Sequence, residues 1–160
     1  TGYIGYETSG NVLFDVSQYD RILVLRKTGA YSVINVPEKL FVDKGMLYCG
    51  FADNETCAQT VFTIVYKNEK GHAHIKRCRI EKFILSKGYS IIPDNCTVLK
   101  ATTLEDVSLT INYKPKPRLR VLRQTFNVSD YAVKGVNAKG VRLASKEVKS
   151  ARFMTGLKLV

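Results

Sequence analysis

The sequence predicts an all-β fold built from repeated hairpins. Apolar residues occur in short runs rich in β-branched side chains, and each run is followed by a basic turn and a second run. Aligned on Lys27, Lys67 and Lys114, this design recurs at steps of 40 and 47 residues. Repeats of roughly 40–50 residues with several strands each are typical of propeller blades and related arrays. About three four-stranded blades are fewer than a closed propeller needs, so an open arc is predicted.

The first two repeats are recognised from paired apolar runs. In the first, residues 21–26 (RILVLR) are apolar on both faces, Gly29 in the turn is free to take a positive φ, and residues 31–36 (YSVINV) return. In the second, residues 61–66 (VFTIVY) lead into a basic turn and residues 72–80 return. These patterns predict two β-hairpins.

The third repeat has the same order of features. Residues 108–113 (SLTINY) lead into a turn at 114–117 (KPKP), and residues 118–123 (RLRVLR) are predicted to return as a strand. No helix is predicted, because Gly140 and the β-branched valines weaken the helical composition of residues 141–153. We therefore predict one domain, residues 1–160, with repeats at roughly 1–42, 43–85 and 86–133 and a closing or partial blade at 134–160.

The positive charge is concentrated toward the C-terminal end. The chain carries 25 Lys and Arg against 14 Asp and Glu, a net charge of +11. Residues 1–50 are neutral, residues 51–100 carry +3 and residues 101–160 carry +8. Such a gradient indicates a face for a polyanion, because each neutralised phosphate releases counterions. The alternative is a charge that only aids solubility. Aromatic residues are few beside these cations, so duplex nucleic acid is expected rather than single strands.

Motifs for catalysis and metal binding are weak or absent in the sequence. It has no Gly-rich phosphate loop, no nucleophile elbow, and no tyrosine in a context that marks it as a nucleophile. His72 and His74 could ligate a metal together, but solvated hairpin histidines are the preferred interpretation. The cysteines form no Cys-x-x-Cys pair, which gives a zinc site little support; they are Cys49, Cys57, Cys78 and Cys96.

A secreted β domain is a further alternative. N-glycosylation patterns begin at Asn54, Asn95 and Asn127, and the even cysteine count would allow disulfides. The pattern is short enough to arise by chance, however, and residues 1–10 lack the features of a signal peptide. No apolar run approaches the roughly 20 residues of a membrane-spanning helix. Because the chain begins within structured-looking sequence, we expect it to be a piece of a longer protein.

Four segments together resemble a known family. Residues 20–29 (DRILVLRKTG) look like the repeat hairpin of the C-terminal domain of the A subunit of bacterial type IIA topoisomerases. Residues 74–77 (HIKR) resemble that repeat's Lys-Arg return strand, and residues 134–142 (KGVNAKGVR) resemble its Gly-Arg-x-x-x-Gly-Val segment. Residues 2–5 (GYIG) are similar to a segment that starts the domain. The resemblance extends over nearly the whole chain.

The resemblance implies a β-pinwheel, an arc or ring of four-stranded blades that binds and bends duplex DNA around a basic outer rim. It implies two protein partners in a heterotetramer, namely the rest of the homodimeric A subunit, and the B subunit, which is the ATPase. The expected location is the bacterial cytoplasm, at the nucleoid. The catalytic tyrosine and the sites for ATP and Mg would lie on other domains. We therefore expect no cofactor, no metal and no catalysis in this chain itself.

Within the family, one departure favours topoisomerase IV (ParC-like) over gyrase. Gyrase carries a box of the form Gln-Arg-Arg-Gly-Gly-Lys-Gly that lets it wrap DNA and add negative supercoils, whereas residues 136–140 (VNAKG) keep only the final Lys-Gly. The resemblance thus implies an accessory domain that presents DNA to the strand-passage core for relaxation and decatenation. A gyrase domain with weakened wrapping is one alternative, and a propeller-like protein-interaction module with an acidic partner is another.

The cations expected to contact DNA lie in the second and third repeats. Alternate residues of a strand share a face, which pairs Arg77 with Arg79 and Arg118 with Arg120. Along an arc of blades, these cations would form a rim that meets successive phosphates without reading the sequence. The predicted DNA-binding residues are Lys76, Arg77, Arg79, Lys114, Lys116, Arg118, Arg120, Arg123, Lys134, Lys139, Arg142, Lys146 and Lys149.

Overall fold

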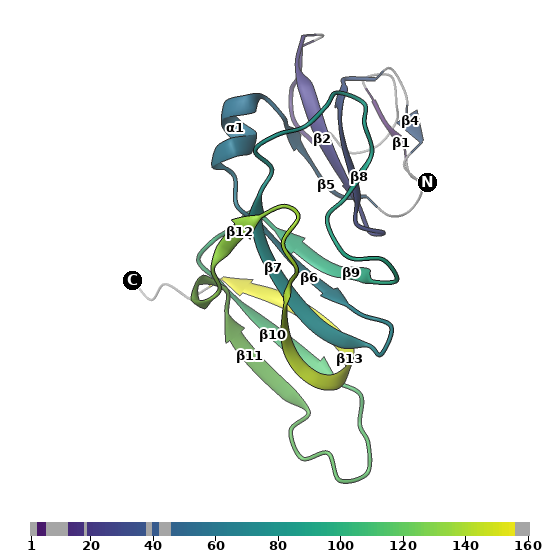
Figure 1. The fold of residues 1–160 in the computed structure, drawn as a ribbon, viewed down its shortest axis with the longest axis vertical. Helices are drawn as coiled ribbons and strands as arrows, with labels where there is room; N and C mark the ends of the chain where they lie inside the picture. The colour runs from purple at the N-terminus through teal and green to yellow at the C-terminus, as the bar shows by residue number, and fades with distance from the viewer. Residues whose placement is uncertain (1–2, 6–12, 18, 38–39, 42–45, 156–160) are drawn as a thin grey trace. The chain divides into compact units, whose positions relative to one another are not determined.

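The chain divides into two units, each built around its own β-sheet (Figure 1). The computed structural model describes residues 3–5, 13–17, 19–37, 40–41 and 46–155. One unit comprises Thr1–Thr60 with Ile80–Ile91, and the other comprises Val61–Arg79 with Ile92–Val160. The all-β prediction is confirmed, and the curled, open sheet of the second unit is consistent with an open β-pinwheel arc. The repeat boundaries drawn from the sequence stay a prediction.

The first unit holds a four-stranded antiparallel sheet in the order β5-β2-β3-β8. The predicted hairpin is confirmed, because β2 pairs with β3 and Gly29 takes a φ of 89° in the turn between them. Residue 2, part of the family-like segment 2–5, lies outside the described residues. The strands are β2 (Arg21–Arg26), β3 (Ala30–Asn35), β5 (Met46–Phe51) and β8 (Tyr89–Ser90), while β1 (Tyr3–Ile4) and β4 (Leu40–Phe41) form a separate pair.

A short helix, α1 (Asn54–Gln59), corrects the expectation that the chain has none. The Cys57 N–H donates to the Asp53 carbonyl at 3.0 Å, and the buried Cys57 side chain anchors the helix. Glu55 lies in the first turn, where a carboxylate is favourable to the helix dipole. Six residues are fewer than two turns, so the sequence shows no 3.6-residue periodicity by which to predict this helix.

The second unit holds a seven-stranded sheet in the order β11-β10-β13-β7-β6-β9, with β12 paired to β7 off this path. The second predicted hairpin is confirmed, because β6 pairs with β7 and Gly71 takes a φ of 77°. The core is formed by buried side chains of several of these strands and includes the fully buried Val65, Ile75, Leu109 and Ile111. The elements are β6 (Phe62–Lys67), β7 (His72–Arg79), β9 (Thr97–Thr102), β10 (Val107–Tyr113), β11 (Arg123–Asn127), the 3-10 helix η1 (Val128–Asp130), β12 (Val133–Gly135) and β13 (Val141–Thr155).

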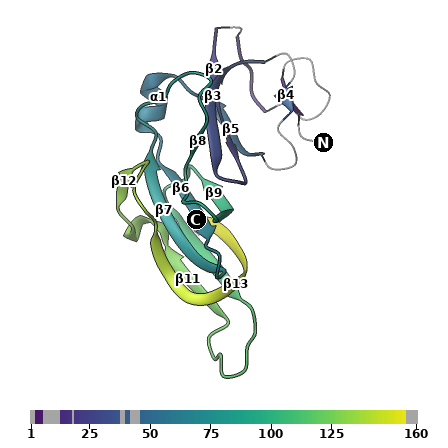
Figure 2. The same cartoon turned by 45° about the vertical axis from the view of Figure 1, so that its right-hand side comes forward.

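The long strand β13 belongs to two parts of this sheet (Figure 2). Its first half pairs with β7 and its second half with β10. Between Arg142 and Glu147 it has more residues than the facing stretch of β7, and Lys149 is an extra residue opposite Asn112 and Tyr113. Bulges of this kind bend a strand, which accounts for the curl of the sheet. Pairing on both sides overrides the helical composition of residues 141–153.

The third hairpin differs from its prediction. The strand that returns along β10 is β11 (Arg123–Asn127), and residues 114–122 form a loop, so the prediction that the returning strand begins at residue 118 is wrong. The Tyr113 N–H donates to the Leu122 carbonyl at 2.8 Å and closes this loop at its base. Inside it, the Leu119 N–H donates to the Lys116 carbonyl at 3.0 Å, and Arg118 has a φ of 71°. A positive φ after Pro117 is the pattern of a type II turn, which interrupts any strand here.

Candidate nucleic-acid interface

The excess positive charge belongs to the second unit. That unit contains 18 Lys and Arg against 6 Asp and Glu, a net charge of +12, whereas the first unit contains 7 against 8, a net charge of −1. The gradient seen along the sequence is thus sharper in the folded protein. The candidate interface is therefore built from the strands and loops of the second unit.

One group of cations surrounds His72 at the start of β7. Burial is the largest cause that lowers the pKa of His72, and the charges of Lys70, Arg142, His74 and Lys116 lower it further. These residues come from the β6–β7 turn, β13, β7 and the loop 114–122. Lys116 and Arg142 were predicted site residues, and the fold brings them together. Lys70 was missed, although the basic turn in which it lies was recognised.

Glu147 of β13 connects this group to the loop 114–122. Its carboxylate accepts a hydrogen bond from Lys114 Nζ at 2.9 Å and lies 3.5 Å from Lys116 Nζ. The hydrogen bond with Lys114 is the largest cause that holds the pKa of Glu147 below its usual range. The backbone adds a further bond, from the Lys114 N–H to the Glu147 carbonyl at 2.9 Å. Two predicted phosphate contacts are therefore already partly neutralised by one acid.

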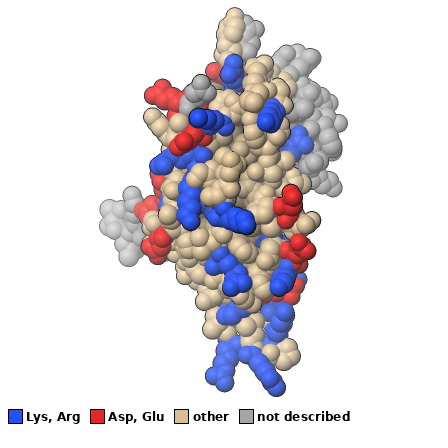
Figure 3. Space-filling model, in the orientation of Figure 1, with Lys and Arg blue, Asp and Glu red and all other residues tan. Residues whose placement is uncertain are grey.

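Arg118 and Arg120 do not lie on one face of a strand, which corrects their predicted placement. Both are exposed residues of the loop 114–122, and they form no ion pair with any residue that the structure describes. Arg123, also exposed, opens β11. Figure 3 shows two groups of blue atoms extending at the end of the second unit where Figure 1 draws this loop. The arginines remain available to phosphates, but they project from a loop instead of lining a sheet.

Strand β13 contributes further cations, of which Lys149 and Arg152 are exposed and Lys146 is half-buried. Lys146 Nζ lies 5.2 Å from the centre of the Tyr113 ring, and Lys149 projects from the bulge opposite β10. Arg152 is exposed opposite Thr110 and is not among the residues predicted from the sequence, because no individual strand was predicted within residues 141–153. In a strand, alternate residues share a face, so Arg152 would have been predicted on the same face as the exposed Ser150.

A second group of cations lies around β12, away from the loop 114–122 in sequence. Lys134 and Lys139 are exposed and help to line a pocket of about 220 Å³. Lys76, at 5% exposure, also lines it, and its ammonium donates to the Val136 carbonyl. Burial lowers the pKa of Lys76. Because its ammonium is used inside the fold, we remove Lys76 from the expected DNA contacts.

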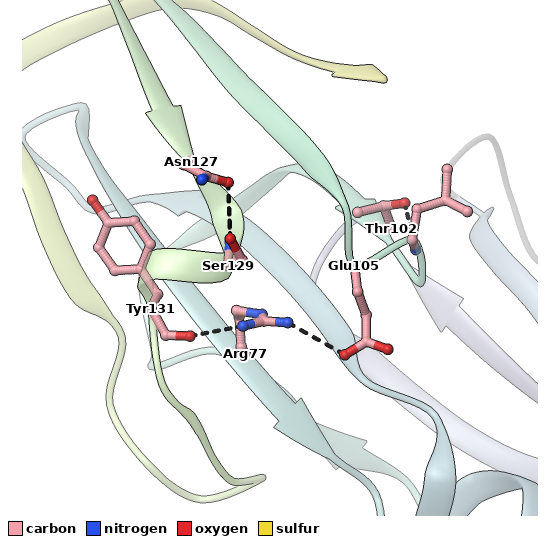
Figure 4. A network of polar contacts seen from close by, with 7 residues as sticks. Arg77, Thr102, Glu105, Asn127, Ser129 and Tyr131 are labelled. Atoms are coloured by element: carbon pink, nitrogen blue, oxygen red, sulfur yellow. Dashed lines mark hydrogen bonds and ion pairs between the residues drawn. The ribbon is translucent and has the colours of Figure 1, made fainter. Parts of the chain in front are cut away.

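Arg77 is likewise a structural residue, at 7% exposure (Figure 4). Its guanidinium donates from Nη1 to the Tyr131 carbonyl at 2.8 Å, and Nη2 lies 3.5 Å from Glu105 Oε1. These contacts tie β7 to the segment after η1 and to the loop before β10. We therefore remove Arg77 from the expected contacts as well. Arg79, half-buried at the end of β7, lies opposite Gly135 of β12.

The residues considered for other chemistry have ordinary surroundings. All four cysteines are free, and burial raises the pKa of the Cys49 thiol to about 11. His74 stacks on Tyr66, with ring centres 5.2 Å apart. Among the residues that the structure describes, no group of three or more His, Cys, Asp or Glu is arranged to hold a metal ion. No helix in the described part of the chain is long and apolar enough to cross a membrane.

The curled sheet and its basic loops define a β-pinwheel-like module with a strongly cationic surface. The family model described as topoisomerase C-terminal domain, Bacteroidota, matches residues 1–155, so the chain belongs to this family of topoisomerase C-terminal domains. The chain is also 26% identical over 145 residues to the A subunit of DNA topoisomerase 4 of Borreliella burgdorferi. That match covers 90% of this chain and 22% of the relative, so the chain spans about a fifth of the relative's length. The family predicted from the sequence is confirmed.

Proposed function

We propose that this domain is the DNA-binding accessory domain of the A subunit of a topoisomerase IV-type enzyme. It binds and bends duplex DNA without sequence preference and presents the duplex to the strand-passage core for relaxation and decatenation. The observation that carries the proposal is the division of charge, +12 on the second unit against −1 on the first. A surface of this kind attracts phosphates through counterion release, which is independent of base sequence.

The proposed contacts are drawn from the exposed and half-buried cations of the second unit. They include Lys70 and Arg152 in addition to the predicted residues, and they exclude the buried Lys76 and Arg77. The half-buried Arg79 stays a marginal member. The remaining proposed contacts are Lys114, Lys116, Arg118, Arg120, Arg123, Lys134, Lys139, Arg142, Lys146 and Lys149.

The chemistry of strand passage is proposed to lie outside this domain. The rest of the homodimeric A subunit would supply the catalytic tyrosine, and the B subunit would hydrolyse ATP with Mg in the bacterial cytoplasm. The similarity to a protein that carries the name DNA topoisomerase 4 supports topoisomerase IV over gyrase. Residues 136–140 support the same choice, because they lack the glutamine and paired arginines of the gyrase box.

Binding to plain duplexes at several salt concentrations tests the proposal. With six phosphate contacts, the logarithm of the affinity should fall with the logarithm of salt at a slope of about −5, equally for unrelated sequences. A flat salt response, or no binding at low salt, would contradict DNA binding. Removing residues 1–160 from the enzyme should reduce decatenation more than cleavage, and loss of a supercoiling activity would indicate gyrase instead.

A further inference from the structure

The loop 114–122 differs from the rest of the basic surface in its composition and its shape. Its sequence, KPKPRLRVL, contains four cations, two prolines and three aliphatic residues, and it contains no Asp, Glu, Asn or Gln. Figures 1 and 2 both draw it extending beyond the ends of β10 and β11. A loop that only held phosphates would need the cations, but it would have no use for exposed aliphatic side chains.

Two of the three aliphatic side chains of this loop are turned to solvent, whereas the half-buried Leu119 packs against the core of the second unit. Val121 is 44% exposed and Leu122 is 45% exposed, on the limb that returns to β11. The prolines and the neighbouring cations of the loop are exposed as well. Apolar surface next to cations fits a duplex groove, where phosphates meet the cations while sugars and bases meet the apolar groups.

The loop is held in shape before any ligand arrives. The hydrogen bond between the Tyr113 N–H and the Leu122 carbonyl closes the base of the loop, and ion pairs with Glu147 hold Lys114 and Lys116 against β13. Each proline fixes its own φ, so the limb that leaves β10 has few other conformations. A preorganised loop loses little entropy on binding, which favours insertion into a narrow site.

Arg118 occupies a backbone conformation that residues other than glycine rarely adopt. Its φ of 71° stands at the position of a type II turn where glycine is the unstrained residue. Such strained positions cluster at ligand-binding sites, where the side chain has a use. The arginine is exposed, at the turn between the two limbs. A guanidinium carried there can enter the minor groove, whose negative potential attracts arginine.

We propose that residues 114–122 form an arm that enters the minor groove of the duplex and kinks it there. Arg118 and Arg120 lie in the groove, and Pro117, Val121 and Leu122 supply the apolar wedge that opens a base step. Partial unstacking by apolar side chains bends a duplex toward the major groove. This inference rests on the proposed DNA binding, but it assigns the bend to one loop, whereas a phosphate-binding rim would bend DNA by distributed contacts.

The test compares bending with binding in the full-length protein that carries this chain. A 30-bp duplex (about three helical turns) carries a fluorophore at each end to report bending, and 2-aminopurine at internal steps reports unstacking. The double variant Val121→Ser with Leu122→Ser keeps every charge. The matched control, Ile84→Ser with Leu104→Ser, changes residues that are 61% and 57% exposed elsewhere in the chain.

If the loop acts as this arm, the double variant should lose the end-to-end energy transfer that reports bending and the 2-aminopurine signal that reports unstacking. Affinity should fall by about three- to tenfold, because the apolar contact is lost. The salt slope should stay within about one unit of the wild-type value, because the phosphate contacts remain. The control should behave as wild type, and a minor-groove ligand such as netropsin should abolish the wild-type signals.

If the double variant bends and unstacks the duplex as the wild type does, the arm proposal is overturned while the proposed DNA binding still stands. Absence of DNA binding by the wild-type protein would instead overturn the proposed function. Loss of decatenation with unchanged bending would show that the loop contacts another protein surface, which also overturns the arm. If the double variant lacks a cooperative melting transition, Val121→Ser alone decides in the same way, because this exposed side chain is not part of the core.

Discussion

Glu147 shows how a single carboxylate can moderate a basic surface. It engages the ammonium groups of Lys114 and Lys116 and lies opposite His72 in the β7–β13 register. DNA phosphates would compete with this carboxylate for the two lysines. If the surface binds DNA as proposed, its affinity would depend on the charge of this one acid as well as on the number of cations.

Replacing Glu147 by glutamine should tighten DNA binding, because it frees two lysine charges while the Tyr113–Leu122 hydrogen bond and the prolines still hold the loop in shape. The substitution releases both lysines, so the salt slope should steepen by about one to two units. Fluorescence anisotropy with a labelled duplex at several salt concentrations measures both quantities. Glu69→Gln, which also removes one acid of the second unit, is the matched control. Equal effects of the two variants would show that net charge alone matters.

His72 reports the positive potential of its surroundings. In the free protein its pKa is lowered, first by burial and then by Lys70, Arg142, His74 and Lys116. Phosphates bound there should raise this pKa toward its usual value. The bound form then holds more protons, so affinity should rise as the pH falls from about 6.5 toward the lowered pKa. An NMR titration of the His72 ring with and without duplex measures the shift. An unchanged pKa in the complex would place the DNA elsewhere.

The same lowered pKa has a consequence for stability. The unfolded chain takes up a proton at His72 more readily than the folded chain does. The contribution of this residue to stability is therefore present above the usual histidine pKa and is lost as the pH falls below it.

Arg77 and Arg118 should separate stability from DNA binding. Arg77→Ala leaves the Tyr131 carbonyl without its donor and Glu105 without its partner, and we expect a loss of about 2 kcal/mol in the free energy of unfolding. Urea denaturation measures this loss, and the DNA affinity of the folded fraction should stay near wild type. Arg118→Ala should do the reverse. A large loss of affinity in Arg77→Ala with unchanged stability would return Arg77 to the interface.

At the scale of elements, turns decided which hairpins could be predicted. The first two hairpins have a glycine with positive φ between two clear apolar runs, so their strands were placed correctly. In the third, the alternation of RLRVLR imitates a strand, but Arg118 takes a positive φ and the ladder starts at Arg123. A positive φ at an arginine leaves no signal in a single sequence.

The sequence allowed the basic region to be predicted from side-chain type and position along the chain, but it did not show which cations are exposed. The concentration of cations in the second and third repeats was visible, and the second unit does carry the excess charge. Which cations are buried was not visible, because Lys76 and Arg77 find carbonyl partners more than fifty residues away in the chain. Contacts at that separation depend on the fold of the whole sheet.

The type II turn at residues 116–119 makes a prediction for the loop as an element. Arg118→Gly removes the strain of a positive φ and should raise the free energy of unfolding by about 1 kcal/mol. The same change should weaken DNA binding, because a guanidinium is lost. Urea midpoints and duplex affinities measured together test this opposition. Arg118→Ala, which loses the guanidinium and keeps the strain, is the control, and a glycine variant no more stable than it would contradict the explanation.

At the scale of the whole molecule, the two units differ in net charge. The first unit is nearly neutral overall, and the second carries all of the net positive charge. Only the second unit should therefore give DNA binding its salt dependence. If the second unit binds the duplex as proposed, the nearly neutral first unit would not compete for it.

Charge reversal in the two units tests this division. Arg118→Glu with Arg120→Glu should weaken binding by at least tenfold, equally for duplexes of different sequence. Lys27→Glu with Lys82→Glu makes the same change in net charge in the first unit and should have a much smaller effect. Binding curves for two unrelated duplexes provide the comparison. A changed preference between the duplexes would indicate that the arginines read bases.

The path of the chain between the units also constrains how the protein is made. The backbone passes from one unit to the other after Thr60, after Arg79 and after Ile91. On a ribosome, the whole β6–β7 hairpin emerges before β8, the strand that completes the first sheet. The first unit cannot close as a finished N-terminal block, so its assembly has to wait for a hairpin that belongs to its neighbour. Nascent chains that end near residue 85 should accordingly be cut by proteases within residues 1–60, whereas chains released beyond residue 91 should resist.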